Sequence, residues 1–193
     1  MKKLRIVLIG DCYVGKTTIV NILRQRESDI YRSTIFEHIS HYLEYDSRKY
    51  ELTILDTSGK DDYVKLRHTA YQKIDLVILC FAVNNNLSYQ HIESKWIPEL
   101  EQNQVRCPKL ILGLKSDLRY QQNVNDFQYI ISHREGKDLA DKFNLNYLEF
   151  GKYSEDISET KFENIIKILK NGIDIIKIAN LHTNKKKQKC LIM

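Results

Sequence analysis

The sequence predicts an α/β domain in which helices cover a mostly parallel sheet. Three apolar runs, at residues 4–9, 76–83 and 110–112, have the continuous hydrophobicity of strands that are buried on both faces. Segments with helical periodicity lie between these runs and after them. This alternation of strands and helices is typical of a parallel sheet covered by helices.

Two further segments predict one antiparallel hairpin at an edge of this sheet. Residues 38–45 and 50–55 are rich in residues that favour strands, and the polar sequence Asp46-Ser47-Arg48-Lys49 separates them. A short polar turn between two such segments is typical of a β-hairpin.

Two capping boxes mark the beginnings of later helices. Ser132 and Thr160 are each followed three residues later by a glutamate, Glu135 and Glu163, which is the spacing of this motif. The second helix carries an apolar stripe that we assign to the core rather than to a partner surface. This stripe consists of Phe162, Ile165, Ile166, Leu169, Ile173 and Ile176.

The length of 193 residues suits one α/β domain with its own core, and no Pro-, Gly- or Ser-rich stretch divides it. We expect the domain to span residues 1–180, and residues 181–193, which are polar and basic, to form a flexible tail. The formal net charge is +5, but four lysines of this tail carry most of it: Lys185, Lys186, Lys187 and Lys189. Nucleic acid is therefore not expected as a partner.

The cysteines and histidines show no spacing typical of a disulfide framework or a metal cluster. The four cysteines are scattered, and the six histidines, His38 and His41 among them, have no partner set of Cys or Asp. The residues after Met1 include too few apolar positions for a signal peptide, and no apolar run is long enough to span a membrane. We therefore expect the protein to be made and kept in the cytosol.

The first apolar run leads directly into the sequence Gly10-Asp11-Cys12-Tyr13-Val14-Gly15-Lys16-Thr17, a G-x-x-x-x-G-K-T pattern. Such a loop between a strand and a helix presents backbone N–H groups to phosphate oxygens. Lys16 can reach the outer phosphates, and the Thr17 hydroxyl can ligate Mg²⁺. An ordinary glycine turn is the alternative. The motif predicts a nucleoside phosphate site, in which we include Thr18.

A second motif indicates which base is bound. Leu114-Lys115-Ser116-Asp117 follows the third apolar run, where a doubly wound sheet places its ligand. An aspartate there can accept hydrogen bonds from both the ring N–H and the exocyclic amine of guanine, whereas adenine offers no such pair. The stem of Lys115 can lie across the base plane. With the phosphate loop upstream, this tetrapeptide predicts GTP or GDP as ligand.

These motifs resemble those of small GTPases of the Ras superfamily, and within it those of the Rho/Rac family. Asp56-Thr57-Ser58-Gly59 resembles the DxxG element, whose Asp supports Mg²⁺ through water and whose Gly N–H meets the γ-phosphate. Thr34-Ile35-Phe36-Glu37 resembles the first switch, in which the Thr closes onto Mg²⁺. Features more specific to Rho are residues 61–67, the sequence Lys95-Trp96-Ile97-Pro98-Glu99, and an apparently shortened insert between Leu118 and Ser132.

The resemblance covers nearly the whole chain. It implies a P-loop small GTPase fold, with a six-stranded, mostly parallel sheet, one antiparallel edge hairpin and about five helices. It implies Mg²⁺ held near Thr17, Thr34 and Asp56, with Gly59 at the γ-phosphate. The implied partners are effectors that bind residues 34–42 and the second switch, exchange factors and GDP-dissociation inhibitors. The implied state is a monomer.

Two departures from the family pattern affect hydrolysis. The glutamine that would orient the attacking water is Lys60 here, and an ammonium cannot accept a hydrogen bond from that water. Cys12 and Tyr13 add side chains beside the γ-phosphate, where small residues fit most easily. With Thr34 and Lys60 as the catalytic positions, we expect hydrolysis to be slow.

Further departures affect the guanine site. Leu114 stands where the family has Asn or Thr, and Glu27-Ser28 lacks the aromatic residue expected at the guanine edge. Glu149-Phe150-Gly151-Lys152 resembles the fifth guanine element loosely, with base contacts expected from the backbone of Gly151 and Lys152. One hydrogen bond is worth about 1 kcal/mol net, so we expect weakened rather than abolished affinity.

The C-terminal sequence Cys190-Leu191-Ile192-Met193 matches a C-a-a-X prenylation signal. A lipid on Cys190 together with the nearby lysines would hold the protein on an anionic cytoplasmic membrane surface. We expect this to be the plasma membrane.

Three interpretations of function remain open. The first is an ordinary cycling switch, and the second is an adaptor that stays in the GTP form, resembling the Rnd subgroup of Rho proteins. The third is a P-loop ATPase or kinase, against which Asp117 and the prenylation signal count. We favour a Rho-like guanine-nucleotide switch with impaired turnover, which by resemblance would act on actin and cell shape.

Overall fold

The computed structural model describes residues 1–24, 36–120, 129–151 and 160–190. Four predicted features lie outside these residues: Thr34, Glu27-Ser28, Lys152 and the final three residues of the prenylation signal. Most of the shortened insert also lies outside them.

Among the described residues, one six-stranded sheet forms the centre of the fold, in the order β2-β3-β1-β4-β5-β6. Every neighbouring pair is parallel except β2 and β3, so the predicted mostly parallel sheet is confirmed. The strands are β1 (Lys2–Gly10), β2 (Phe36–Tyr45), β3 (Arg48–Thr57), β4 (Leu76–Ala82), β5 (Lys109–Leu114) and β6 (Asn146–Phe150).

The β2–β3 hairpin at the sheet edge is confirmed, with a tighter turn than the polar sequence suggested. Strand β3 already begins at Arg48, which leaves only Asp46 and Ser47 in the turn. Both have positive φ angles, 52° and 54°, as two-residue hairpin turns of this handedness require.

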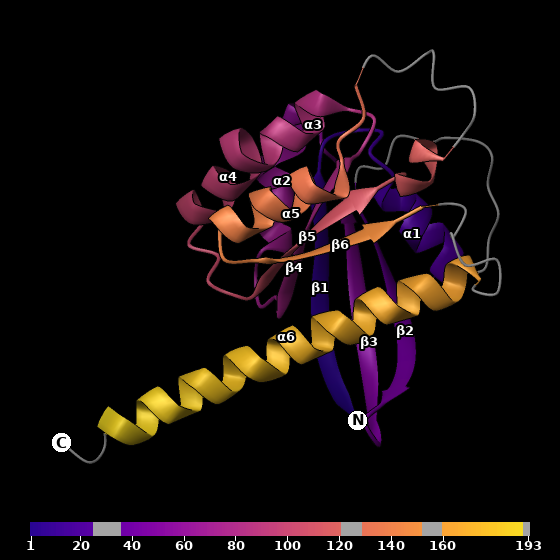
Figure 1. The fold of residues 1–193 in the computed structure, drawn as a ribbon. Coiled ribbons are helices and arrows are strands. Elements are labelled where there is room, and N and C mark those ends of the chain that lie inside the picture. The colour runs from indigo at the N-terminus through magenta and orange to yellow at the C-terminus, as the bar shows by residue number, and fades with distance from the viewer. Residues whose placement is uncertain (25–35, 121–128, 152–159, 191–193) are drawn as a thin grey trace.

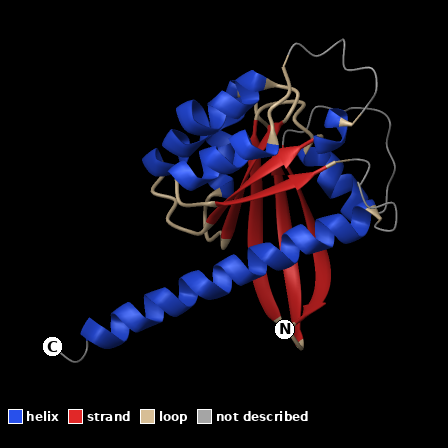
Figure 2. Cartoon of the chain, viewed as in Figure 1, coloured by secondary structure: helices blue, strands red, loops and turns tan. Residues whose placement is uncertain are grey.

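In the described parts of the chain, five main helices pack on the sheet, if α3, the π-helical turn η2 and α4, which follow one another without a break, are counted as one. Figures 1 and 2 show α1 and α6 on one face and α2 to α5 on the other. Each face has its own buried apolar cluster. The helices are α1 (Lys16–Leu23), α2 (Val64–Ala70), α3 (Asn86–His91), η2 (Ile92–Trp96), α4 (Ile97–Gln102), α5 (His133–Lys142) and α6 (Lys161–Cys190), with the short 3-10 helices η1 (Asp61–Tyr63) and η3 (Ser116–Arg119).

Both predicted capping boxes are present. The Ser132 hydroxyl accepts from the backbone N–H of Glu135 at 3.2 Å, and Thr160 does the same for Glu163 at 3.2 Å. The glutamate carboxylates accept in return from the backbone N–H groups of Ser132 and Thr160, both at 2.8 Å. The apolar stripe of α6 packs into the core as predicted, most deeply at Ile165, Leu169, Ile173 and Ile176.

Helix α6 continues to Cys190, whereas the sequence predicted a flexible tail from residue 181. No Gly or Pro follows Gly172 before Cys190, and a lysine-rich sequence without helix breakers can prolong a helix that packing has already nucleated. In Figure 1 the C-terminal part of α6 runs past the edge of the sheet. Among the described helices, α6 included, none combines the length and the hydrophobicity needed to cross a bilayer.

Candidate nucleotide-binding site

The phosphate-loop sequence forms the connection between β1 and α1. Gly10 ends β1 with φ 146°, and a Cβ there would lie 2.0 Å from the carbonyl oxygen of Cys80, so only glycine fits. Gly15, with φ 116°, directly precedes the first helical residue, Lys16. The loop therefore leads into a helix N-terminus, whose free N–H groups and dipole attract phosphate.

Lys16 is folded into this loop. Its ammonium donates to the carbonyl oxygens of Gly10 and Asp11, both at 2.7 Å, and its side chain is almost fully buried. Burial lowers the pKa of Lys16, and the nearby Asp56 carboxylate opposes that effect. A bound polyphosphate would supply the negative charge that favours the ammonium form.

The other side chains of the loop and of the start of α1 differ in their exposure to solvent. Val14 is buried, Cys12 is partly exposed, and Thr18 is exposed on α1. Tyr13 has φ 64° and is 63% exposed, so its ring lies at the surface of the loop rather than in the core. The Thr18 N–H donates to the Gly15 carbonyl at 3.1 Å, which continues the turn into α1.

Thr17, in the first turn of α1, meets Asp56 near the end of β3. The Thr17 hydroxyl donates to Asp56 Oδ2 at 2.6 Å, and Asp56 is fully buried. A hydroxyl and a carboxylate are hard oxygen donors that suit Mg²⁺, so this pair fits the predicted metal position. The third expected ligand, Thr34, is outside the described residues. Within the described parts of the chain, no group of three or more His, Cys, Asp or Glu could hold a metal alone.

The DxxG element touches the phosphate loop. A Cβ on Gly59 would lie 2.5 Å from both the Cys12 nitrogen and the Gly10 carbonyl oxygen, so this close approach requires glycine. The following residue, Lys60, has an exposed side chain. Its N–H donates to Ser58 Oγ at 3.3 Å, which fixes the backbone at this position.

A buried ion pair that the sequence analysis missed holds this element in place. Arg67 of α2 is 1% exposed and donates to both carboxylate oxygens of Glu99, each at 2.7 Å. It also donates to the carbonyl oxygens of Ser58 at 2.8 Å and Lys60 at 3.2 Å. The available signal was that one Rho-specific segment ends in a basic residue, Arg67, and the other in an acidic residue, Glu99.

The predicted base-binding residues lie at the end of β5. Leu114 is buried, and its apolar side chain lies beside the phosphate loop, since its Cδ1 would be 3.6 Å from a Cβ on Gly15. Lys115 adopts a left-handed conformation with φ 61°, and burial lowers its pKa. Asp117, in η3, is 8% exposed.

The end of β6 is brought against Asp117. A Cβ on Gly151 would lie 2.6 Å from the Asp117 nitrogen and 2.9 Å from its Oδ1. Arg119, also missed from sequence, ties the same two elements together, because it donates to both carboxylate oxygens of Glu149, at 2.6 and 2.9 Å. The motif of β5 and the loosely matching motif of β6 therefore do meet in space.

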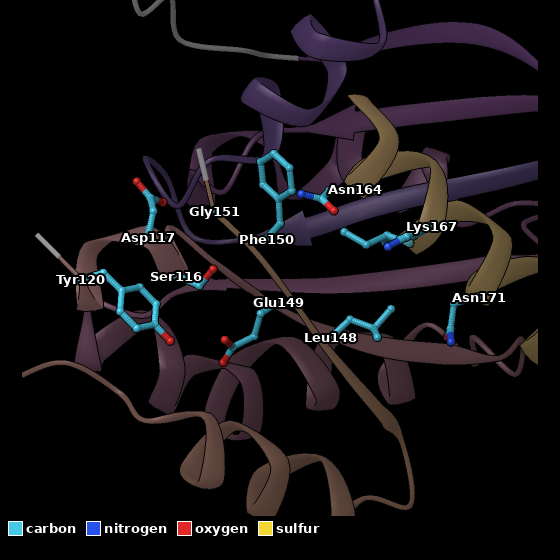
Figure 3. A pocket seen from close by; sticks show the side chains of 11 residues that line it. Ser116, Asp117, Tyr120, Leu148, Glu149, Phe150, Gly151, Asn164, Lys167 and Asn171 are labelled. Carbon is cyan, nitrogen blue, oxygen red and sulfur yellow. The ribbon is translucent and has the colours of Figure 1, made fainter. Parts of the chain in front are cut away.

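A cavity of about 430 Å³ adjoins this base end of the site. Figure 3 shows it between η3, β6 and α6, with Asp117 and Gly151 at one end and Asn171 at the other. Its wall combines apolar side chains, such as Leu148 and Phe150, with polar residues from α6. A cavity of this kind is typical of ligand sites at the carboxyl ends of sheet strands.

The fold and these contacts define a P-loop nucleotide-binding protein. The model of the Ras family matches residues 5–171. The Ras-like GTP-binding protein RHO1 of Entamoeba histolytica is 33% identical over 202 residues, covering 99% of this chain and 91% of that protein. The GTP-binding protein rho3 of Schizosaccharomyces pombe is 36% identical over 151 residues, 75% of this chain and 72% of that protein. The Ras-like GTP-binding protein RhoL of Drosophila melanogaster is 27% identical over 194 residues, 100% of this chain and 95% of that protein.

The chain belongs to the Ras family of small GTPases, and these relatives identify it as a Rho-like member. It is therefore a guanine-nucleotide switch of this class. Members of this family bind GTP and GDP, generally with Mg²⁺, and act through effectors and regulators. Membership of this family also argues against the interpretation of the chain as a P-loop ATPase or kinase.

Proposed function

We propose that this Rho-like GTPase hydrolyses GTP slowly and signals from the cytoplasmic face of the plasma membrane to the actin cytoskeleton. The proposal of slow hydrolysis rests on Lys60, which directly follows the Gly59 that packs on the phosphate loop. A residue at this position is well placed to act on the attacking water, but lysine has no acceptor for it.

The remaining site residues suit binding better than chemistry. Gly10, Gly15 and the start of α1 would surround the phosphates, and Lys16 would neutralise their charge. Thr17 and Asp56 would hold Mg²⁺, which when bound neutralises charge on the phosphate oxygens. Cys12 would add bulk beside the γ-phosphate. The chain thus retains the groups that bind GTP while lacking the one that orients water.

Single-turnover hydrolysis of bound GTP tests this proposal. The double variant Lys60→Gln, Cys12→Gly should hydrolyse GTP about a hundredfold faster than the wild type, the factor associated with correct placement of a reacting group. Lys65→Gln, which removes an exposed lysine of α2, is the matched control and should change nothing. A wild type as fast as the double variant would refute slow hydrolysis.

The alternative is an adaptor that remains bound to GTP throughout its lifetime. The combination of Lys60 with the two bulky residues Cys12 and Tyr13 favours it, because each opposes hydrolysis independently. The nucleotide in freshly purified protein distinguishes the two hypotheses. Bound GTP supports the adaptor, whereas bound GDP supports slow cycling or preferential GDP binding.

Effector binding through residues 34–42 and the second switch is supported by the position of β2. This strand forms one edge of the sheet, and Tyr42 is 65% exposed. An exposed edge strand with an aromatic side chain suits a protein partner. Tyr42→Ala should therefore weaken the effect of the overexpressed protein on cell shape without changing nucleotide affinity.

Membrane attachment rests on the C-terminal sequence. Prenylation of Cys190 would supply one anchor, and the four neighbouring lysines would each add about 1 kcal/mol at an anionic surface. Cys190→Ser should release tagged protein to the soluble fraction of cells, while Cys107→Ser, which leaves the signal intact, should not. If Cys190→Ser stays fully membrane-bound, prenylation is not the anchor.

A further inference from the structure

Trp96 is fully buried and makes a polar contact with the phosphate loop. Its indole N–H donates to Asp11 Oδ1 at 2.8 Å. The other oxygen of the same carboxylate lies 2.7 Å from His91 Nδ1. Both oxygens of Asp11 are therefore held by one helical segment that is distant in sequence.

The π-helical turn η2 explains how two residues of one helix reach the same carboxylate. In a π-helix the residues i and i+5 are hydrogen-bonded neighbours, whereas in an α-helix the neighbours on one face are i+3 and i+4. His91 and Trp96 are five residues apart: His91 directly precedes this turn, and Trp96 is its last residue. A regular α-helix would direct these two side chains to different sides.

The indole ring of Trp96 also contacts Arg67, which lies in the segment of residues 58–67 that begins within the DxxG element. The guanidinium carbon of Arg67 lies 4.9 Å from the ring centroid, and Lys95 Nζ lies 4.8 Å from it. Lys95 pairs with Asp61 at 2.6 Å, and Arg67 donates to the carbonyls of residues 58 and 60. One side chain therefore contacts the phosphate loop through its N–H and the 58–67 segment through its ring.

We propose that Trp96 is a positioning residue of the nucleotide site: it fixes the phosphate loop through Asp11 and ties that loop to residues 58–67. The proposal rests on the nucleotide binding argued above. The position of Asp11 affects Lys16 directly, because the Asp11 carbonyl is one of the two acceptors of the Lys16 ammonium. A loop released from Trp96 would hold Lys16, and hence the phosphates, less firmly.

The dissociation rate of a fluorescent GDP analogue in the presence of Mg²⁺ tests the link to the loop. Trp96→Phe keeps a ring for the two cations but removes the N–H donor. It should accelerate dissociation about tenfold, the scale of a lost hydrogen bond to a charged group. Asp11→Ala should do the same, and the double variant should dissociate no faster than Asp11→Ala alone.

Ile92→Val is the matched control, because Ile92 is buried in the same π-helical turn and is apolar. It should lower the melting temperature slightly but leave the dissociation rate unchanged. Trp96→Phe with the wild-type dissociation rate would overturn the proposal. So would effects of Trp96→Phe and Asp11→Ala that multiply in the double variant, because Trp96 would then act independently of Asp11.

The link to residues 58–67 has its own spectroscopic test. Trp96 is the only tryptophan of the chain, so intrinsic emission reports on it alone. Replacement of GDP by a non-hydrolysable GTP analogue should change this emission, and unchanged emission would refute the link. A wild type that binds no GDP analogue would instead refute the nucleotide assignment, and the proposal with it.

Discussion

At the scale of single residues, we propose that Asp117 carries the choice of base. It lies in η3, just after β5, is buried, and is packed so closely against Gly151 that a larger residue at position 151 would clash with it. The close approach of Gly151 limits where this carboxylate can lie. Such preorganisation favours discrimination, because a base without the matching donors leaves a buried carboxylate unpaired.

Asp117→Ala should reduce the preference for GDP over ATP by at least about tenfold, since a hydrogen bond to a charged group is worth about 1.5–3 kcal/mol. Competition between fluorescent GDP and ATP in the presence of Mg²⁺ measures this preference. Asp138→Ala, which removes an exposed carboxylate of α5, should leave it unchanged. Equal affinity of the wild type for GDP and ATP would contradict the role of Asp117.

At the scale of elements, the Arg67–Glu99 pair joins α2 to α4 and fixes the backbone after the DxxG element. The hydroxyl of Tyr71 also donates to Glu99. Burial by itself raises the pKa of Glu99, but the hydrogen bonds from Arg67 and Tyr71 outweigh it and hold this pKa below the ordinary value of 4.5. The carboxylate form of Glu99 is therefore favoured in the folded state.

The lowered pKa of Glu99 makes the stability of the fold depend on pH. A carboxyl group with a lowered pKa stabilises the fold above its ordinary pKa of 4.5, and this stabilisation is lost as the pH falls through the lowered value. Glu99→Gln should cost about 3 kcal/mol near pH ~7, because it leaves Arg67 as a buried charge without its counterion. The difference in the free energy of unfolding between Glu99→Gln and the wild type should shrink under acidic conditions.

Urea unfolding of both proteins across this pH range measures the effect. The control is Glu101→Gln, on an exposed position of the same helix α4, which should cost little at any pH. A Glu99→Gln cost that stays constant as the pH falls would contradict the assignment.

At the scale of the whole molecule, α6 has two parts with different roles. Its N-terminal part covers one face of the sheet, and its most C-terminal buried residue among the described side chains is Ile176. Just beyond it, Lys177 pairs with Asp46 of the β2–β3 turn at 3.1 Å. The remainder extends past the sheet and carries the lysines and Cys190 (Figure 1).

Two truncations should separate these parts. Deletion of residues 183–193 should leave GDP binding intact and change the melting temperature by less than about 2 °C, since it spares Ile176 and Lys177. Deletion of residues 173–193 also removes Ile173 and Ile176, each of which contributes about 2–5 kcal/mol to the free energy of unfolding. This deletion should lower the melting temperature by more than about 10 °C. Thermal unfolding followed by circular dichroism distinguishes them. Similar melting temperatures for the two truncated proteins would show that α6 packing contributes little.

Local patterns determined most of the fold. Short segments of the sequence specify the buried strands, the edge hairpin, both capping boxes and the apolar stripe of α6. Within such segments, periodicity and hydrogen-bonding side chains act over a few residues. The sequence alone also located the phosphate loop and Asp117, because each motif directly follows a buried strand. It placed the end of the last helix too early, since composition does not reveal how far a packed helix propagates.

Only the tertiary structure decided which distant residues support the site. The contact of Trp96 with Asp11, the Arg67–Glu99 pair and the approach of Gly151 to Asp117 all join segments separated by more than thirty residues. No local pattern encodes such pairs, because they depend on how the helices dock on the sheet. The sequence determined the chemistry available for binding a guanine nucleotide, and the packing of buried side chains decided how rigidly that chemistry is held.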